Sequence, residues 1–366
     1  MLVMLLQFER RDTASKPLMF ATPFIAIAIT IFFSSIMLLI QGKSLQTTFY
    51  TFFIEPFAST YAISEVFLKF GPLLFIAQAL AIGFRAKVWN IGAEGQMIMG
   101  AIFASSVPVY FTESESVFLL PAMILLGALG GLVWAAIAAF LKTRYNANEI
   151  LVTLMLSSVA LQILYYFLLG PWKDPMGFNF PQTVMFQDAA LFPPIIFGFR
   201  LNYSLIIPII FTIFVWIYME KRFGGFQLTV GGLAPRAATY AGYSANGAVW
   251  KSLLIAGMAA GIAGMSEVAG PIGQLQRSVT SGYGYSAIIV AYLGALHPIG
   301  IVFAAFFLSV IHIGGDYALV TAKLPISSVH IFQGLLLVTY LASYTLVNYR
   351  FKPRKARIEE IESSLT

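Results

Sequence analysis

The polar side chains that could do chemistry are few, and most stand at the ends of apolar runs. Residues 84–96 read FRAKVWNIGAEGQ and bring Asn90, Glu94 and Gln96 together beside two glycines. This pattern favours a broken helix, whose N-terminus could present backbone N–H groups to a polar solute. An ordinary short turn with a capped helix would need the same residue types. The segment is therefore either a solute-binding helix end or a turn.

A second polar feature is Glu267, which stands within the run GIAGMSEVAG near the end of an apolar segment. A carboxylate at mid-bilayer costs on the order of 3 kcal/mol, so such a residue normally faces a cavity or a partner. The position near the end of the run reduces this cost. Solute contact and a structural hydrogen bond both remain as interpretations.

Known catalytic motifs are absent from the sequence. Residues 41–44 read QGKS, as at the end of a phosphate-binding loop, but Met37 occupies the position of its first glycine. There is no G-x-S-x-G and no H-E-x-x-H. The chain has no cysteine, and His297, His312 and His330 are far apart in sequence. We therefore expect no catalytic residues, no metal site and no ATP hydrolysis by this chain.

The elements that position these residues are membrane helices. Hydrophobic residues make up 59% of the chain and charged residues 10%, whereas soluble domains are roughly a quarter charged. An all-α polytopic membrane protein with about ten transmembrane helices is predicted, two of them too short to cross unless extended or broken. The expected spans are residues 18–40, 71–83, 96–111, 117–141, 150–170, 201–219, 252–270, 286–296, 299–314 and 326–347.

The distribution of basic residues sets the expected orientation. With the N-terminus inside, only six of the 22 Lys and Arg residues fall in outer segments. These six are Lys43, Lys69, Lys173, Arg200, Arg277 and Lys323. The positive-inside rule then places both termini in the cytoplasm. The net charge of +6 reflects topology and lipid contact, so nucleic acid is not an expected partner.

This topology divides the chain into a cytoplasmic segment, residues 1–17, a transmembrane domain, residues 18–347, and a cytoplasmic tail, residues 348–366. The tail is basic and then acidic, which is typical of a solvated helix or a disordered end. An outer loop, residues 171–200, could hold an interfacial helix or a docking surface, or could pack as a plug over the spans.

Residues 220–251 form a polar, glycine-rich segment between two apolar runs, on the cytoplasmic side by the charge count. Pro235 suits a first helical position and Gly242 a helix stop, which predicts a short helix between them. Arg236 and several small residues would cover its surface. A two-turn helix is marginal alone in water. It must therefore rest either on its own spans or on another protein.

Six motifs that follow one another in order resemble a known family. They are NIGAEGQ at 90–96, NEILVTLML at 148–156, GPWKDPMGFNFPQ at 170–182, VGGLAPRAATYAGY at 230–243, EVAG at 267–270 and YGYSAIIVAYLGALHPIG at 283–300. They are similar to permease subunits of ABC importers in the branched-chain amino acid and simple-sugar group. Within it they most resemble the nucleoside and simple-sugar permeases that work with basic-membrane-protein-type binding lipoproteins.

The resemblance implies a multi-pass protein of the bacterial inner (plasma) membrane in which two permease chains, as a hetero- or homodimer, form a translocation path. A separate ABC ATPase would bind ATP and Mg, so this chain needs no cofactor of its own. An extracytoplasmic binding protein or lipoprotein would deliver the solute, a nucleoside or a simple sugar.

The resemblance also implies roles for residues. In the family, the loop after the sixth span forms a coupling helix, which maps onto residues 232–243. The expected ATPase-coupling residues are Pro235, Arg236, Ala237, Ala238, Tyr240 and Gly242. The expected substrate-path or gate residues are Asn90, Glu94, Gln96, Asn148, Glu149 and Glu267. Asn148 and Glu149 lie near the inner face, where gating or helix capping suits them better than solute recognition.

The chain departs from the family pattern at several positions. Ala234 replaces an asparagine before Pro-Arg-Ala-Ala, Thr239 replaces an arginine, and Ser157 ends the LMLN pattern. The changes in the loop, Ala234 and Thr239, point to a particular ATPase partner. Ser157 lies inside a span that could line the translocation path, so the identity of the solute stays undetermined.

An ion-coupled secondary transporter of a small polar solute is the alternative function, but it would need more buried Asp, Glu or His. A membrane-embedded enzyme would need a catalytic cluster.

Overall fold

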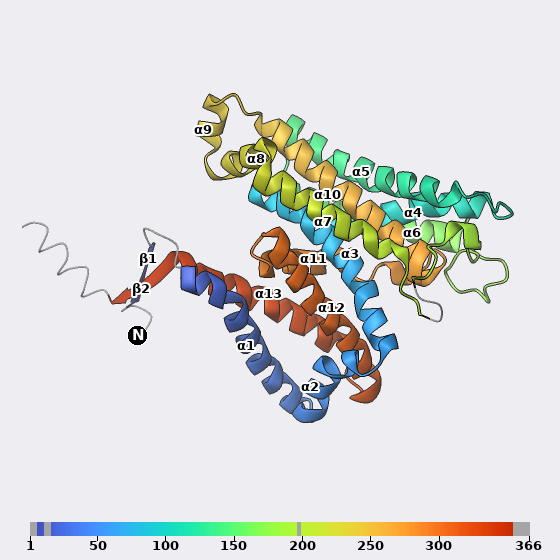
Figure 1. Ribbon diagram of the computed structural model, residues 1–366, viewed down its shortest axis with the longest axis horizontal. Helices are drawn as coiled ribbons and strands as arrows, with labels where there is room; N and C mark the ends of the chain where they lie inside the picture. Colours follow the sequence, from blue (N-terminus) through green and yellow to red (C-terminus); the bar gives the residue numbers. More distant parts are fainter. Residues whose placement is uncertain (1–5, 11–15, 196–198, 354–366) are drawn as a thin grey trace, which may run out of the picture. The chain divides into compact units, whose positions relative to one another are not determined.

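The computed structural model describes residues 6–10, 16–195 and 199–353, most of which are helical (Figure 1). Among the described residues, eight helices are long and apolar enough to cross a membrane. They are Ala21–Ile40, Thr60–Arg85, Leu119–Tyr145, Glu149–Leu169, Tyr203–Lys221, Ala245–Ile272, Pro298–Thr321 and Ile326–Tyr344. The predicted class, a helical multi-pass membrane protein, is confirmed. A total of ten spans and the side of each terminus stay predictions.

The chain divides into two compact units. Unit 1 comprises residues 1–47 and 325–366. Its helices α1 (Lys16–Ile40) and α13 (Ile326–Asn348) pack together, and the hydroxyl oxygens of Thr30 and Thr339 are 2.8 Å apart between them. Strand β1 (Leu6–Arg10) pairs antiparallel with β2 (Tyr349–Pro353). These strands are not predicted by the sequence pattern, which gives the tail as helical or disordered. Residues 354–366 of that tail lie outside the described residues.

Unit 2 comprises residues 48–324 and holds the helices in which most of the predicted site residues stand. In chain order its elements are α2 (Leu45–Phe53), η2 (Glu55–Phe57), α3 (Thr60–Arg85), α4 (Ala93–Tyr110), α5 (Leu119–Tyr145), α6 (Glu149–Leu169), η3 (Asp188–Ala190), η4 (Tyr203–Leu205), α7 (Ile206–Lys221), α8 (Phe223–Leu233), α9 (Pro235–Tyr240), α10 (Ala245–Glu267), the π-helix η5 (Val268–Ile272), η6 (Arg277–Val279), α11 (Tyr283–Leu293) and α12 (Pro298–Thr321).

Helix α10 lies at the centre of unit 2 and packs against α3, α4 and α5 (Figure 1). Glycines make this close packing possible. A Cβ added at Gly261 would lie 2.1 Å from the carbonyl oxygen of Gly127, and one added at Gly131 would lie 2.0 Å from that of Gly257. Small residues are the usual means of helix association in lipid, where apolar burial gives no drive between helices.

Helix α3 begins at Thr60, eleven residues before the predicted span of residues 71–83. The prediction was too short because Glu65 and Lys69 interrupt the apolar run. Lys69 was expected in an outer loop, and the structure places it inside α3 instead. The charges are accommodated by partners from other elements, since Arg200 lies 3.2 Å from the Glu65 carboxylate.

The predicted outer loop, residues 171–200, packs over the end of α10. The backbone amides of Thr183, Phe186 and Phe192 donate to the carbonyls of Leu275, Gly273 and Ala269 at 2.8–3.0 Å. Its described residues contain one short 3-10 turn, η3, and no longer helix. Of the three interpretations, the packed plug describes most of this segment, although Phe178 near its tip is 94% exposed.

Candidate functional site

The short helix predicted within residues 220–251 is present as α9 (Pro235–Tyr240). Pro235 stands at its first turn, and Gly242 follows it with φ +79°. The amide of Tyr243 donates to the carbonyl of Ala238 at 2.9 Å, and that of Gly242 to Thr239 at 3.0 Å. These bonds satisfy the last carbonyls as in a Schellman-type stop, which requires a left-handed residue at this position. Both predicted boundary signals are therefore confirmed.

Helix α9 has one buried position and one open face. Ala238 is buried against unit 2, whereas Arg236, Ala237, Tyr240 and Ala241 are exposed. Arg236 and Tyr240 are four residues apart, as are Ala237 and Ala241, so each pair shares a face of the helix. Tyr240 is 98% exposed. The open face of α9 is thus a small apolar surface with one arginine beside it.

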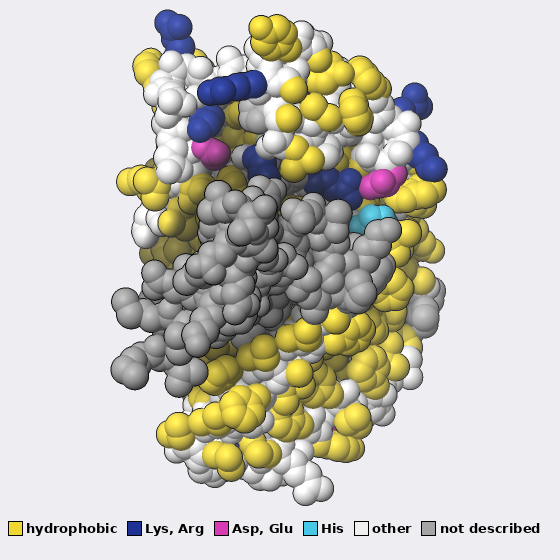
Figure 2. All heavy atoms as spheres, turned by 90° about the vertical axis from the view of Figure 1, so that its left-hand side faces the viewer, with side chains coloured by type: hydrophobic (Ala, Val, Ile, Leu, Met, Phe, Trp, Pro, Cys, Tyr) yellow, Lys and Arg dark blue, Asp and Glu magenta, His cyan; other side chains and the backbone are white. Residues whose placement is uncertain are grey.

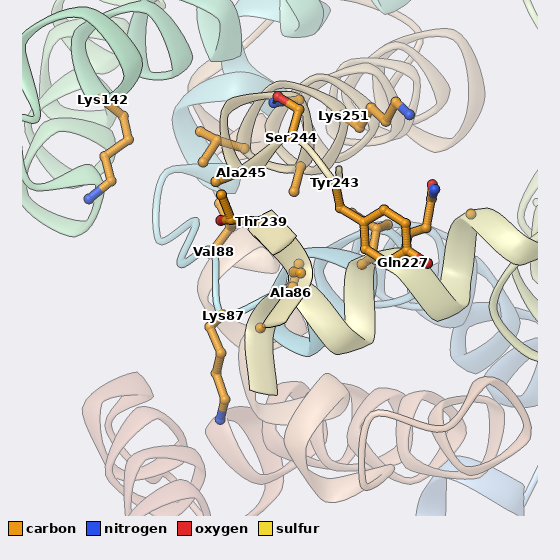
Figure 3. Close-up of a pocket in the computed structure, with 18 of the residues that line it drawn as sticks. Ala86, Lys87, Val88, Lys142, Gln227, Thr239, Tyr243, Ser244, Ala245 and Lys251 are labelled. Atoms are coloured by element: carbon orange, nitrogen blue, oxygen red, sulfur yellow. Dashed lines mark hydrogen bonds between the residues drawn. The ribbon is translucent and has the colours of Figure 1, made fainter. Parts of the chain in front are cut away.

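A cavity of about 550 Å³ lies beneath α9 (Figure 3). Its walls come from α8, α9, the start of α10 and the turn of residues 86–88. The lining residues include Gln227, Ala238, Thr239, Tyr243 and Lys87, whose side chain points away from the other labelled residues. Because a void adjoins its inner side, α9 contacts the spans over only part of its surface.

The segment that carries α9 contacts α3 at two positions, Glu220 and Gly232. Glu220 forms a 2.9 Å ion pair with Arg85 at the end of α3. The Arg85 Nε atom also donates to the carbonyl of Leu296 at 2.9 Å, beyond α11. Gly232 of α8 fits against the backbone of Arg85 and Ala86, where an added Cβ would lie 2.5 Å from a carbonyl oxygen. A displacement of this segment would therefore pull on α3 and on the turn after α11.

Lys and Arg side chains gather at the end of unit 2 that carries α8 and α9 (Figure 2). Lys87, Lys142 and Lys251 line the cavity at this end. Basic residues concentrate on the cytoplasmic side of membrane proteins. By this rule the end with α8 and α9 is the expected cytoplasmic side, and its orientation stays a prediction.

The polar segment at residues 84–96 forms a closed network. The side-chain amides of Asn90 and Gln96 bond reciprocally at 2.9 and 3.2 Å. Asn90 Oδ1 also accepts from the amide of Gly92 at 3.0 Å. Both side chains are buried. Of the two interpretations, the geometry matches a capped turn that leads into α4.

Two of the first four amides of α4 are also engaged within the chain. The Ser157 hydroxyl accepts from the amide of Gly95 at 3.2 Å, and the amide of Gln96 bonds to the Gly92 carbonyl at 3.1 Å. An added Cβ at Gly95 would lie 2.5 Å from Ser157 Cα, so α4 and α6 touch at this point. Ser157, one of the departures from the family pattern, thus supports the start of α4 in this conformation.

Glu94 holds the beginning of α11. Its two carboxylate oxygens accept from the amides of Gly282 and Gly284 at 3.0 and 2.7 Å, and the side chain is buried. A carboxylate at a helix N-terminus satisfies amides that have no partner in the helix and interacts favourably with the helix dipole. Its close approach needs a glycine, because an added Cβ at Gly284 would lie 2.1 Å from the Glu94 amide nitrogen.

Replacing Glu94 by alanine should lower the free energy of unfolding by about 2 kcal/mol, because two buried amides lose their acceptors. Thermal unfolding of the purified protein in detergent measures this change. Glu113→Ala is the matched control, since Glu113 is an exposed carboxylate and its loss should leave the transition in place. An unchanged transition in Glu94→Ala would mean that the carboxylate does not support α11.

Asn148 and Glu149 stand where the sequence predicts a gate or a cap. Asn148 precedes α6 and its Oδ1 atom accepts from the amides of Ile150 and Leu151 at 3.0 and 3.4 Å. Glu149 forms a 2.8 Å ion pair with Lys142 near the end of α5. Both residues therefore fix the α5–α6 connection, as expected for capping.

Glu267 stands at the end of α10 where the π-helix η5 begins. It is 3% exposed and interacts electrostatically with Lys69 and Arg200. The Arg200 guanidinium also donates to the carbonyl of Pro271 at 2.7 Å, within η5. Of the predicted path residues, Asn90 and Gln96 thus bond to each other, whereas Glu94 and Glu267 both interact with the region around Tyr283.

Lys69 and Tyr283, which interact with Glu267, and Asp316, which interacts with Lys69, were not singled out as site residues from the sequence. The interrupted apolar run before residue 71 was the available signal for Lys69. Among the described residues, no group of three or more Asp, Glu or His side chains is arranged to hold a metal ion.

The chain is similar over most of its length to permease proteins of ABC transporters. A glucose ABC transporter permease protein of Haloferax volcanii is 30% identical over 94% of this chain and 93% of its own length. A guanosine ABC transporter permease protein of Bacillus subtilis is 28% identical over 88% of this chain and 93% of its own. A nucleoside ABC transporter permease protein of Lactococcus lactis is 28% identical over 80% and 82%. No solved structure matches the chain.

The family described as branched-chain amino acid transport system / permease component matches residues 62–341. The match runs from the third residue of α3 into α13 and includes all the predicted site residues. Together with the full-length relatives, it shows that this chain belongs to that permease family.

Proposed function

We propose that the chain is the permease subunit of a binding-protein-dependent ABC importer that carries nucleosides or simple sugars, and that it couples to its ATPase through α9. Family membership supports the permease function, and the relatives named for glucose, guanosine and nucleosides support the solute class. The observation that carries the coupling is the open face of α9. A six-residue helix that exposes Tyr240 and Arg236 needs a further surface to rest on.

The proposed partners follow from this assignment. ATP and Mg would bind to the separate ATPase, and this chain needs no cofactor. A second permease chain, identical or different, would complete the path. A binding protein would dock on the side of the plug, residues 171–200. Both termini, residues 1–17 and 348–366, and the segment of residues 220–251 would lie in the cytoplasm of a bacterial cell, with residues 18–347 in its inner membrane. The basic end of unit 2 supports this orientation (Figure 2).

Reconstitution tests the proposal. The chain would be placed in liposomes with the ATPase, second permease and binding protein encoded beside it, and uptake of labelled guanosine and glucose would be measured with and without ATP. We expect uptake only when ATP, the ATPase and the binding protein are all present. Uptake by this chain alone, driven by an ion gradient, would instead show a secondary transporter.

A further inference from the structure

A second group of ionisable side chains lies inside the helices of unit 2, away from α9. Glu65 and Lys69 are four residues apart on α3, and His312 and Asp316 are four residues apart on α12, so each pair shares one helix face. Helices α3 and α12 pack against each other. At 1.5 Å per residue, Lys69 and Asp316 lie about 13 and 8 Å from the nearer ends of their helices.

Tyr283 and Glu267 join the two pairs. The Lys69 ammonium lies 5.1 Å from the centroid of the Tyr283 ring, and the His312 ring lies 6.1 Å from the same ring. Glu267 is next to Tyr283 and interacts with Lys69, which also interacts with Asp316. We call Lys69, Glu267, Tyr283, His312 and Asp316 the outer polar cluster.

The outer polar cluster holds a buried polar contact of poor geometry. The Tyr283 side chain is fully buried beside the Glu267 carboxylate, and its phenol oxygen meets that carboxylate outside ordinary hydrogen-bond geometry. A buried hydroxyl that is left without a good hydrogen bond costs about 1–3 kcal/mol, so a change of geometry or a hydroxyl group of a solute could improve this contact. By contrast, the side-chain amides of Asn90 and Gln96 bond to each other reciprocally with ordinary geometry.

The cluster also opens to the surface of unit 2. Asp316 is exposed, whereas Glu267 is buried. A carboxylate in a span that faces hydrocarbon costs on the order of 3 kcal/mol, so the face of α12 with Asp316 must meet water or another chain. The opposite face of α12 carries Phe303, which is 72% exposed and suited to lipid.

Local backbone geometry marks the same place. The π-helix η5 (Val268–Ile272) starts immediately after Glu267. This π-turn ends the helix, as π-turns commonly do at helix C-termini, so the last turn of the span lies directly beside Glu267. Arg200 stabilises this turn from outside, through its bond to the carbonyl of Pro271.

We propose that the outer polar cluster contacts the transported solute in the translocation path, and that it suits a neutral, hydroxyl-rich solute. The inference rests on the proposed import function and specifies where in the permease the solute is held. Its carboxylates accept hydrogen bonds from hydroxyl groups, and Lys69 and Tyr283 donate them. Counting Glu65 and Arg200, the site has three acidic and two basic side chains, so a phosphorylated or carboxylated solute would meet net repulsion.

Single-cysteine labelling tests the access that the proposal requires. The chain has no cysteine, so Asp316→Cys introduces a unique thiol. The complete complex in lipid nanodiscs would be treated with a charged methanethiosulfonate reagent, with binding protein that is either empty or loaded with guanosine or glucose, and with ATP present. Phe303→Cys is the control. It lies 13 residues away on α12, about 140° around the helix at 3.6 residues per turn.

We expect Asp316→Cys to react at least about tenfold faster than Phe303→Cys, because thiolates do not form in hydrocarbon. Loaded binding protein should slow the reaction several-fold more than empty binding protein does. A thiol at position 316 that does not react, or that reacts equally in both conditions, would overturn the inference.

A second measurement separates this inference from the proposed function. Lys69→Gln and Asp316→Asn should lower the number of solute molecules moved per ATP hydrolysed by about tenfold, the effect of losing one hydrogen bond to a charged group. This ratio is independent of the amount of folded protein. Normal ratios in both variants, with normal ATP-dependent uptake by the unmodified chain, would refute the cluster alone. Absence of ATP-dependent uptake in the unmodified chain would refute the proposed function.

Discussion

Replacing Gly261 by alanine should destabilise the protein by about 2 kcal/mol and reduce the yield of folded protein in the membrane. The added Cβ would lie 2.1 Å from the carbonyl oxygen of Gly127 and 3.0 Å from the Cα atom of Gly131. Both obstacles are backbone atoms, which cannot turn aside as the end of a long side chain can. Overpacking of this kind costs about 3 kcal/mol, whereas alanine gains about 1 kcal/mol over glycine in a helix. Steric exclusion therefore outweighs helix propensity.

Gly231→Ala is the matched control for this prediction. Gly231 is also helical, in α8, but nothing lies within 4 Å of an added Cβ there. The same substitution should therefore leave the unfolding transition unchanged or raise it slightly, because only the propensity gain remains. Thermal unfolding in detergent and the monodisperse fraction after purification would be measured for both variants. Equal behaviour of the two proteins would mean that α5 and α10 are not held by close backbone contact.

The spans were predictable where the apolar run was continuous. The predicted start of α13 at residue 326 agrees with the structure, and α6 begins within one residue of the prediction. Helix α3 was predicted eleven residues too short, because hydropathy treats Glu65 and Lys69 as the end of a span. What makes them tolerable inside a helix is the packing of Arg200, Tyr283 and α12 around them, and none of these is near in sequence.

In the candidate site too, features set by neighbouring residues could be predicted, whereas contacts between distant parts of the chain could not. The boundaries of α9 depend on local signals, a proline at the first turn and a glycine with positive φ, and both could be predicted. The contacts of Glu94 depend on Gly282 and Gly284, almost two hundred residues away. A sequence shows that a buried carboxylate needs partners, but only the fold shows that these partners are backbone amides of α11. The paired strands β1 and β2 were missed for a similar reason, since they join the two ends of the described chain.

Replacing Ala237 by tryptophan should abolish most ATP-driven uptake while leaving the permease folded. Ala237 lies on the open face of α9, so the indole has room in the isolated chain and should not disturb its stability. If an ATPase groove receives this face, the indole overpacks it and weakens docking by about 1.4 to 3 kcal/mol, a loss of about ten- to a hundredfold in affinity. Arg236→Glu should have a similar effect, because it reverses the one charge beside Ala237 on this face.

Uptake, ATP hydrolysis and co-purification of the ATPase would be measured together, because the prediction concerns the connection between them. Arg144→Glu is the control for charge reversal, since Arg144 is exposed near the end of α5 and lies outside α9. We expect uptake to fall in Ala237→Trp and Arg236→Glu but not in Arg144→Glu, with unfolding temperatures unchanged in all three. The Glu220–Arg85 ion pair joins the start of the segment that carries α9 to the end of α3, which is the connection through which we expect a push on α9 to act. Normal coupled uptake in both α9 variants would show that the ATPase pushes on a different surface.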